Sequence, residues 1–137
     1  MKLNPFIILN GHAKEAIEFY KQALGAEVIT LSTYGNMPEQ TPEEINDLVA
    51  FANLKIGKTV LMIADNGDPK SNSISQGNQV TICITPEDTD GAQKVFDALK
   101  QEGQIIFPLE KTSFSPAYSN VIDKFGITFH IFTEGDL

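Results

Sequence analysis

The sequence contains no arginine. All ten of its basic residues are lysine, against eighteen aspartates and glutamates. The formal charge of −8 argues against a nucleic-acid or membrane-surface partner, because both need a basic footprint. A clamp for a strongly anionic substrate usually uses the guanidinium fork of arginine, although lysine can serve as a point charge. The composition therefore disfavours a strongly anionic substrate without excluding it.

Cysteine and long apolar runs are also scarce. Cys83 is the only cysteine, so no internal disulfide can form, and this fits a reducing compartment. The apolar run Phe6–Leu9 near the N-terminus is too short for the core of a signal peptide, and no later run approaches the length of a membrane span. We therefore expect a cytoplasmic protein.

Two similar stretches, 53–66 and 121–134, organise the chain. Each has an apolar run, a tight turn that contains Gly57 or Gly126, and a second apolar run, which predicts a β-hairpin. At a constant offset the two stretches align Leu54 with Ile122, Lys55 with Asp123, Val60 with Thr128, Met62 with His130 and Ile63 with Ile131. The sequence therefore predicts an internal repeat.

Each hairpin follows a strand, an amphipathic helix and a second strand. In the first half, the pattern predicts a strand at Phe6–Leu9, a helix at Ala13–Leu24 and a strand at Glu27–Tyr34. Thr41–Glu44 has the pattern of a capping box, which predicts a short helix to about Asp47. Its acidic residues fit a solvated helix face: Glu39, Glu43, Glu44 and Asp47.

In the second half, we expect strands at Gln79–Thr85 and Gln104–Phe107. The helix between them is capped by Asp88 or Thr85. Its apolar stripe is Ala92, Val95, Phe96 and Leu99. We predict a single domain over 1–137, with unit one at about 1–66, a connector at 67–78 and unit two at about 79–137.

The predicted fold class is α+β. Two βαβββ units form paired, cupped, mixed sheets, with the helices outside and a concave surface between the sheets. The stretches Phe6–Gly11, Ala16–Glu27 and Asp123–Ile131 resemble the vicinal oxygen chelate superfamily, which includes glyoxalase I, extradiol dioxygenases and the fosfomycin and bleomycin resistance proteins. The stretch Tyr34–Pro38 is similar to its PhnB-like branch, often labelled 3-demethylubiquinone methyltransferase-like. This resemblance also implies a homodimer.

The resemblance implies a divalent-metal site with one side chain from each of four strands, at Pro5, Met62, Gln79 and His130. Of these, only His130 is a good ligand for a first-row metal. We therefore expect no metal and no other cofactor at this site. The resemblance to a methyltransferase finds no support in the residues, because no glycine-rich nucleotide turn follows a strand.

Strand alternation extends the four positions to a mostly apolar lining with a few polar groups, as is typical of a small-molecule site. The alternative is that the same side chains simply fill a core. We expect the ligand-binding residues to be Ile7, Leu9, Met62, Gln79, Thr81, Thr128, His130 and Phe132.

The chemistry of this lining leaves alternatives open. His130 is a general base, a remnant metal ligand, or a buried histidine bonded to Gln79 or Thr128. Cys83, between two isoleucines, fits an inert buried thiol better than a nucleophile. Several residues of the two irregular segments form either a lid or a dimer contact: Tyr34, Met37, Phe107, Phe114 and Tyr118.

The family resemblance, taken with these residues, leaves two functions open. The first is a metal-free protein that binds an apolar or aromatic small molecule between the sheets, with no catalytic residue assigned. The second is a divalent-metal-dependent lyase, isomerase or dioxygenase that uses His130, Gln79 and, after a register shift, Glu134.

Overall fold

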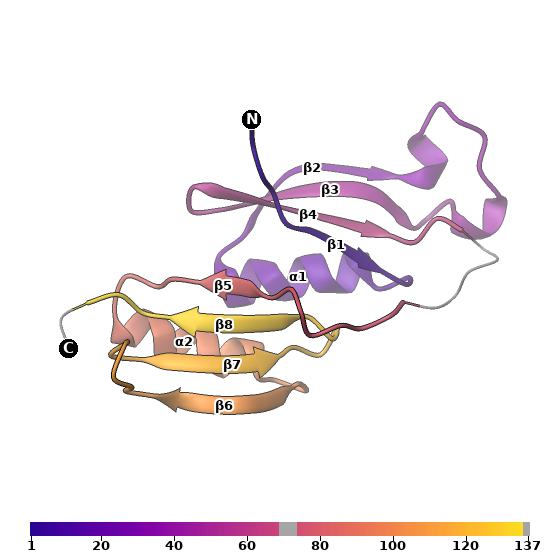
Figure 1. Cartoon of the computed structure of the whole chain (residues 1–137). Helices are drawn as coiled ribbons and strands as arrows, with labels where there is room; N and C mark the ends of the chain where they lie inside the picture. The colour runs from indigo at the N-terminus through magenta and orange to yellow at the C-terminus, as the bar shows by residue number, and fades with distance from the viewer. Residues whose placement is uncertain (69–73, 136–137) are drawn as a thin grey trace. The chain divides into compact units, whose positions relative to one another are not determined.

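The strands form two four-stranded sheets of the same topology (Figure 1). The structure, a computed structural model, describes residues 1–68 and 74–135. Strand order is β1-β4-β3-β2 in the first sheet and β5-β8-β7-β6 in the second. In each sheet one outer pair is parallel and the other pairs are antiparallel. The predicted α+β fold of two βαβββ units with mixed sheets is confirmed.

The chain divides into two compact units, Met1–Ser75 and Gln76–Leu137. Part of the predicted connector, 69–73, lies outside the described residues. The elements of the first unit are β1 (Phe6–Leu9), α1 (Ala13–Leu24), β2 (Glu27–Thr33), the 3-10 turns η1 (Tyr34–Asn36) and η2 (Glu43–Ile45), β3 (Val49–Ile56) and β4 (Thr59–Asp65). Those of the second are β5 (Ile82–Ile84), α2 (Thr89–Leu99), β6 (Gln104–Glu110), β7 (Tyr118–Ile122) and β8 (Thr128–Phe132).

Helix α1 is held at both ends by features that are not part of its apolar stripe. At its start the Ala13 N–H donates to Oδ1 of Asp65, 3.0 Å away at the end of β4. At its end Gly25 adopts φ 64°, the left-handed conformation that glycine reaches without strain. Oδ2 of Asp65 also accepts from the Val49 N–H at 3.0 Å. One buried carboxylate therefore joins the helix start to strands β3 and β4.

The expected capping box at Thr41 does not form. The segment makes only the single turn η2, and Pro42 precedes it without a side-chain cap. The Thr41 hydroxyl contacts the Tyr34 carbonyl and the Asn46 side chain instead. The contact with Tyr34 of η1 therefore takes the place of the side-chain cap that the local sequence predicts. In α2, by contrast, Asp88 is the cap, because its carboxylate accepts from the Gly91 N–H at 2.7 Å.

The turn of the second hairpin is longer than that of the first. The prediction that the two stretches align at one constant offset is therefore wrong for the strand before the turn. Leu54 is buried opposite Leu61 on β4, and its counterpart opposite Phe129 on β8 is Val121, not Ile122. The buried Asp123 carboxylate stabilises this turn by accepting from the N–H groups of Phe125 and Ile127. The pairing of Met62 with His130 holds, but Asn53 now corresponds to Asn120.

Each sheet has one face covered by its helix and one open face. Helix α1 contacts β2, β3 and β4, and α2 contacts β7 and β8 (Figure 1). The covered faces bury an apolar core: Ile7, Leu9, Ala52, Leu54, Leu61 and Ile63 in the first unit, and Val121, Phe129 and Ile131 in the second. The alternating residues form the open faces: Phe6, Ile8, Asn53, Val60 and Met62 in the first, and Cys83, Tyr118, Asn120, Thr128, His130 and Phe132 in the second.

Candidate functional site

The predicted lining of the first unit is split between the two faces of its sheet. Ile7 is opposite Ile63 and Leu9 is opposite Asp65, so both lie on the covered face and are 5% exposed. Met62 is opposite Phe6, on the open face. The expectation that Ile7 and Leu9 share a face with Met62 is therefore wrong, because parallel pairing shifted the alternation of β1 by one residue.

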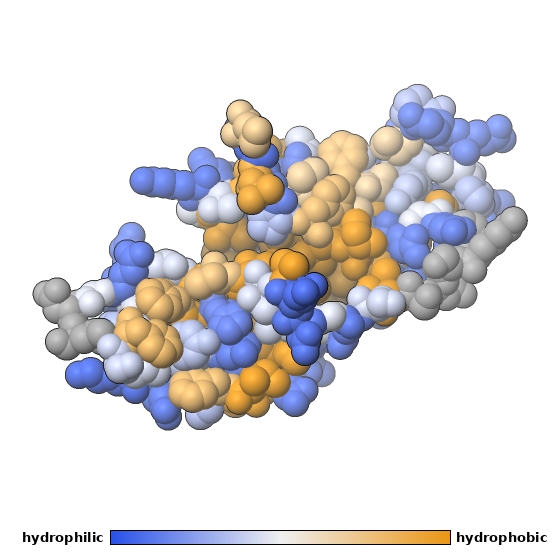
Figure 2. All heavy atoms as spheres, viewed as in Figure 1, coloured by the Kyte–Doolittle hydropathy of each residue, from blue (hydrophilic) through white to orange (hydrophobic). Residues whose placement is uncertain are grey.

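In the second unit the open face brings three of the predicted residues together. Thr128, His130 and Phe132 alternate along β8 and point away from the buried Phe129 and Ile131. Apolar side chains also lie at the surface over the sheets of each unit in Figure 2. The open face of the second unit is the better candidate for a ligand site because it combines aromatic, hydroxyl and imidazole groups.

His130 is hydrogen-bonded to Tyr118, not to Gln79 or Thr128 as the sequence suggested. Its Nδ1 lies 2.7 Å from the Tyr118 hydroxyl, and the two rings are 5.8 Å apart. Tyr118 stands on β7 opposite Phe132, diagonal to His130. The hydroxyl fixes the imidazole plane and leaves Nε2 as the remaining ring nitrogen.

Aromatic rings surround this pair on one side. The Tyr118 ring lies 5.1 Å from Phe114 and 5.5 Å from Phe107, and Phe114 stacks on Phe132 at 6.0 Å with 9° between the planes. These separations are typical of favourable aromatic pairs. Phe107, Phe114 and Tyr118 were expected as a lid or a dimer contact, and the structure packs them together as an aromatic wall beside His130.

Gln79 and Thr81 precede the strand that was expected to carry them. β5 comprises only Ile82–Ile84, and Gln79 is exposed ahead of it. The residue of β5 directly opposite His130 is Cys83. Cys83 is exposed, so the expectation of a buried thiol is wrong: its two isoleucine neighbours point to the other face, and β5 is an edge strand.

Two asparagines occupy equivalent positions on the open faces. Asn53 is opposite Met62, and Asn120 is opposite His130. In both, Oδ1 is buried and has no hydrogen-bond partner among the described residues. The constant offset hid this equivalence, since it aligned Asn53 with Val121. Their only sequence signal is an asparagine in the middle of each apolar hairpin strand.

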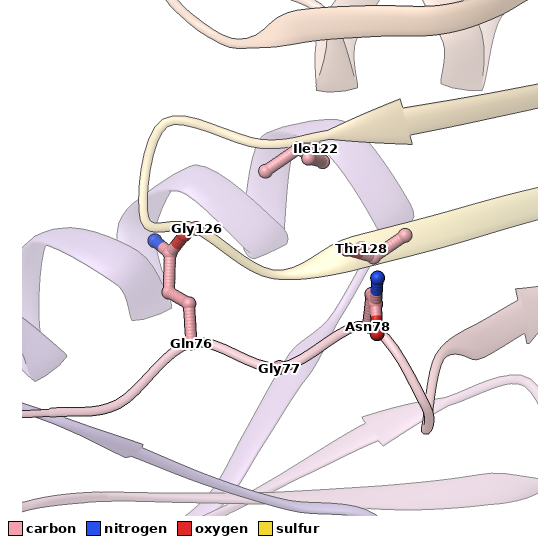
Figure 3. A pocket seen from close by; sticks show the side chains of 6 residues that line it. All are labelled: Gln76, Gly77, Asn78, Ile122, Gly126 and Thr128. Atoms are coloured by element: carbon pink, nitrogen blue, oxygen red, sulfur yellow. The ribbon is translucent and has the colours of Figure 1, made fainter.

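A pocket of about 350 Å³ adjoins Thr128 at the hairpin end of the open face. It lies where Gln76–Asn78 runs beside the β7–β8 hairpin, with the Gln76 side chain directed at Gly126 and Asn78 beside Thr128 (Figure 3). The lining residues are Gln76, Gly77, Asn78, Ile122, Gly126 and Thr128. None of them is charged, so the pocket suits a neutral group.

The donor set does not fit the divalent-metal site that the family resemblance implies. Pro5 has no side-chain donor, Met62 offers a thioether, and Gln79 lies outside β5. Over residues 1–68 and 74–135 no group of three or more histidine, cysteine, aspartate or glutamate side chains is placed to hold a metal ion. A catalytic first-row metal needs three protein ligands.

Similarity to known proteins agrees with this fold. Residues 2–131 match the sequence profile of the Glyoxalase/Bleomycin resistance protein/Dioxygenase superfamily. Protein YjdN of Escherichia coli is 25% identical in an alignment of 141 positions, which covers 96% of this chain and 94% of YjdN. No helix in the described ranges is long and apolar enough to cross a membrane.

Solved structures extend the comparison. The crystal structure of protein PA1353 from Pseudomonas aeruginosa matches with a TM-score of 0.89 and 27% identity over 99% of each chain. A PhnB protein from Bacillus cereus matches with a TM-score of 0.81 and 22% identity over 98% of this chain and 100% of that chain. The chain belongs to the glyoxalase/bleomycin resistance/dioxygenase superfamily, and its structural neighbours include PhnB-like proteins.

Proposed function

We propose that this protein binds an apolar or aromatic small molecule, without a divalent metal, on the open face of its second sheet. The observation that carries the proposal is the aromatic wall of Phe107, Phe114 and Tyr118, with Phe132 stacked on Phe114. A hydrogen bond joins Tyr118 of this wall to His130 as a pair. Small-molecule sites commonly combine such a surface with a few fixed polar groups.

The arrangement suggests how a ligand would be held. An aromatic ligand gains from stacking on Phe114 or Phe132, and one polar substituent can bond to the imidazole or the hydroxyl of the pair. The neutral pocket beside Thr128 offers space for a further uncharged group. Gln79 and Thr81 stay predicted ligand residues of the second unit. Met62 stays a prediction from the sequence that this site on the second sheet does not use, and Ile7 and Leu9 are better explained as core.

The test is a screen of a neutral aromatic fragment library by two-dimensional NMR with the intact chain. We expect hits to shift the amide signals of Thr128, His130 and Phe132, and Phe132→Ala to weaken binding about tenfold through lost stacking and burial. Ile105→Ala is the matched control, because Ile105 is 45% exposed on the same sheet but pairs with Val121 of the covered face.

Two outcomes would contradict the proposal. One is a screen in which no fragment shifts the open-face signals. The other is equal weakening by Phe132→Ala and Ile105→Ala. A stoichiometric divalent metal that is lost in His130→Ala would instead favour the metal-dependent lyase, isomerase or dioxygenase.

We also propose a cytoplasmic homodimer. The single cysteine supports a reducing compartment. Dimerisation is supported by the family resemblance and by apolar side chains on the open face of the first sheet, where Phe6 is 48% and Ile8 is 43% exposed. A second copy of the chain would remove this apolar surface from water.

A further inference from the structure

The open face of the second sheet contains three successive pairs of residues that face each other across β7 and β8. Along both strands, residues of this face alternate with buried ones. In order along the sheet, the pairs are Tyr118 with Phe132, Asn120 with His130, and Ile122 with Thr128. Because a strand rises about 3.4 Å per residue, neighbouring pairs lie about 7 Å apart and the three pairs extend over about 14 Å.

The three pairs differ in chemistry from one end of the face to the other. In the first pair, Tyr118 belongs to the aromatic wall and Phe132 stacks on Phe114 of that wall. The third pair, Ile122 and Thr128, lines the uncharged pocket (Figure 3). The middle pair is polar. A molecule that lies along the strands therefore meets aromatic rings at one end, polar groups at its centre and an uncharged pocket at the other end.

The middle pair contains a hydrogen-bond acceptor that the protein leaves unsatisfied. Oδ1 of Asn120 is buried, and no donor within 1–68 or 74–135 bonds to it. A buried polar atom without a hydrogen bond costs free energy, so native proteins contain few of them. The residue as a whole is only partly buried, and the terminal torsion of an asparagine side chain is soft. The amide can therefore turn its oxygen towards a donor on a bound molecule.

We propose that Asn120 determines specificity by selecting ligands that carry an N–H or O–H donor near their centre. The ligand class is a neutral, elongated aromatic molecule. Its ring packs beside Phe132, its donor bonds to Oδ1 of Asn120, and its uncharged end reaches the pocket at Thr128. This inference rests on the proposed function, since it specifies the ligand of the same face. Asn120 is not among the four positions that the family resemblance implies.

The test compares two neutral ligands that differ at one group. 2-Acetamidonaphthalene has an N–H next to its rings, and in 2-naphthylacetone a CH₂ group replaces that N–H. In NMR titrations of the intact chain, the amide should bind about fivefold to tenfold more tightly than the ketone, the typical contribution of one hydrogen bond between neutral groups. Asn120→Leu, which has a side chain of similar size, should bind both ligands with the weaker affinity of the ketone.

The order of groups along the face has its own measurement. Intermolecular nuclear Overhauser effects should connect the naphthyl protons of the amide to Phe132 and its methyl protons to Thr128. The opposite orientation would contradict the proposed order.

Asn53→Leu is the matched control, because it removes the equivalent buried acceptor from the first sheet and should leave the preference for the amide unchanged. The melting temperature of Asn120→Leu should be no lower than that of the wild type, since the substitution removes a buried acceptor that has no partner in the described part of the chain. A lower melting temperature would indicate a structural role for Asn120 instead.

The outcomes separate this inference from the proposed function. Equal affinity of the wild type for the two ligands, or a preference for the amide that survives in Asn120→Leu, would overturn the inference and leave the proposed function standing. Binding of neither ligand to the wild type would contradict both. Loss of the preference in Asn53→Leu as well would overturn the assignment to Asn120.

Discussion

At the scale of single residues, buried carboxylates connect segments that are distant in sequence. Asp65 is 2% exposed and accepts hydrogen bonds from the backbone of Ala13 and Val49. Its own carbonyl accepts from the Tyr34 hydroxyl at 2.8 Å. Three parts of the first unit therefore meet at one residue, and the two backbone N–H groups that its carboxylate accepts explain an acidic residue at the end of an otherwise apolar strand.

Asp65→Ala should strongly destabilise the first unit. The substitution leaves two buried N–H groups without an acceptor, which should lower the free energy of unfolding by about 2–5 kcal/mol. Urea denaturation measures the loss. Glu39→Ala is the control, because it removes the same charge from an exposed segment and should change stability by less than about 0.5 kcal/mol. Equal effects of the two substitutions would contradict this role of Asp65.

Tyr34 should make stability depend on alkaline pH. Burial raises the pKa of the Tyr34 phenol above its usual 10.0, and the negative charge of Asp65 raises it further. The folded state therefore holds the proton more tightly than the unfolded state. The stabilising contribution is complete below the unfolded pKa, about 10, and is lost as pH rises through the higher folded value.

The measurement compares wild type with Tyr34→Phe by chemical denaturation over a range of pH. Near neutral pH, the variant should be about 1 kcal/mol less stable through loss of the bond to the Asp65 carbonyl. This difference should shrink above about pH 10. A difference that stays constant into the alkaline range would show that Tyr34 does not hold its proton as the structure implies.

At the scale of elements, the longer turn of the β7–β8 hairpin shifts the alignment of the second repeat relative to the first. The same hairpin forms one side of the pocket. Gly126 has φ 86° in its turn, and a Cβ at this position would overlap the Gln76 amide. The turn conformation therefore requires the glycine, and a Cβ would also have to displace the end of the Gln76 side chain. The first hairpin needs a positive φ only at Gly57, in a shorter turn.

Gly126→Ala should lower the free energy of unfolding by about 1–2 kcal/mol, because a non-glycine residue is strained in the left-handed region. It should also displace Gln76 and change the pocket, which the NMR signals of Asn78 and Thr128 would report. Gly77→Ala is the matched control on the same pocket, since a Cβ there meets nothing within 4 Å. If both substitutions gave the same unfolding midpoint, the turn requirement would be refuted.

At the scale of the whole molecule, the charge of −8 acts on association between copies. If the protein is the dimer that we propose, two acidic chains repel each other until salt screens the charge. Sedimentation equilibrium should give twice the 15.0 kDa chain mass at physiological salt and partial dissociation at low salt. A single chain mass at every salt concentration and protein concentration would exclude the dimer.

Local patterns in the sequence were enough for most of the fold. The helix predicted at Ala13–Leu24 forms with these bounds and buries Ala13, Ala16, Ile17 and Tyr20. Both predicted hairpins also form. These signals succeed because helix and strand periodicity is a property of neighbouring residues. The capping box at Thr41 failed where a contact with η1 competed with the local signal.

The candidate site depended far more on tertiary structure. The sequence identified His130, Thr128 and Phe132 on one face, because they alternate along a single strand. It did not identify Tyr118 as the partner of His130 or Cys83 as its neighbour, since both relations depend on strand register. A shift of one residue in pairing moves every side chain to the other face, as Ile7 illustrates.

The sequence by itself determined the repeated βαβββ order, the positions of its helices and hairpins, and the poor match to a divalent-metal site. Only the tertiary structure decided which strand residues are core and which stand on an open face, and which polar groups meet there. The physical reason is that periodicity is encoded locally, whereas register is chosen by the combined packing of helix, strands and turns.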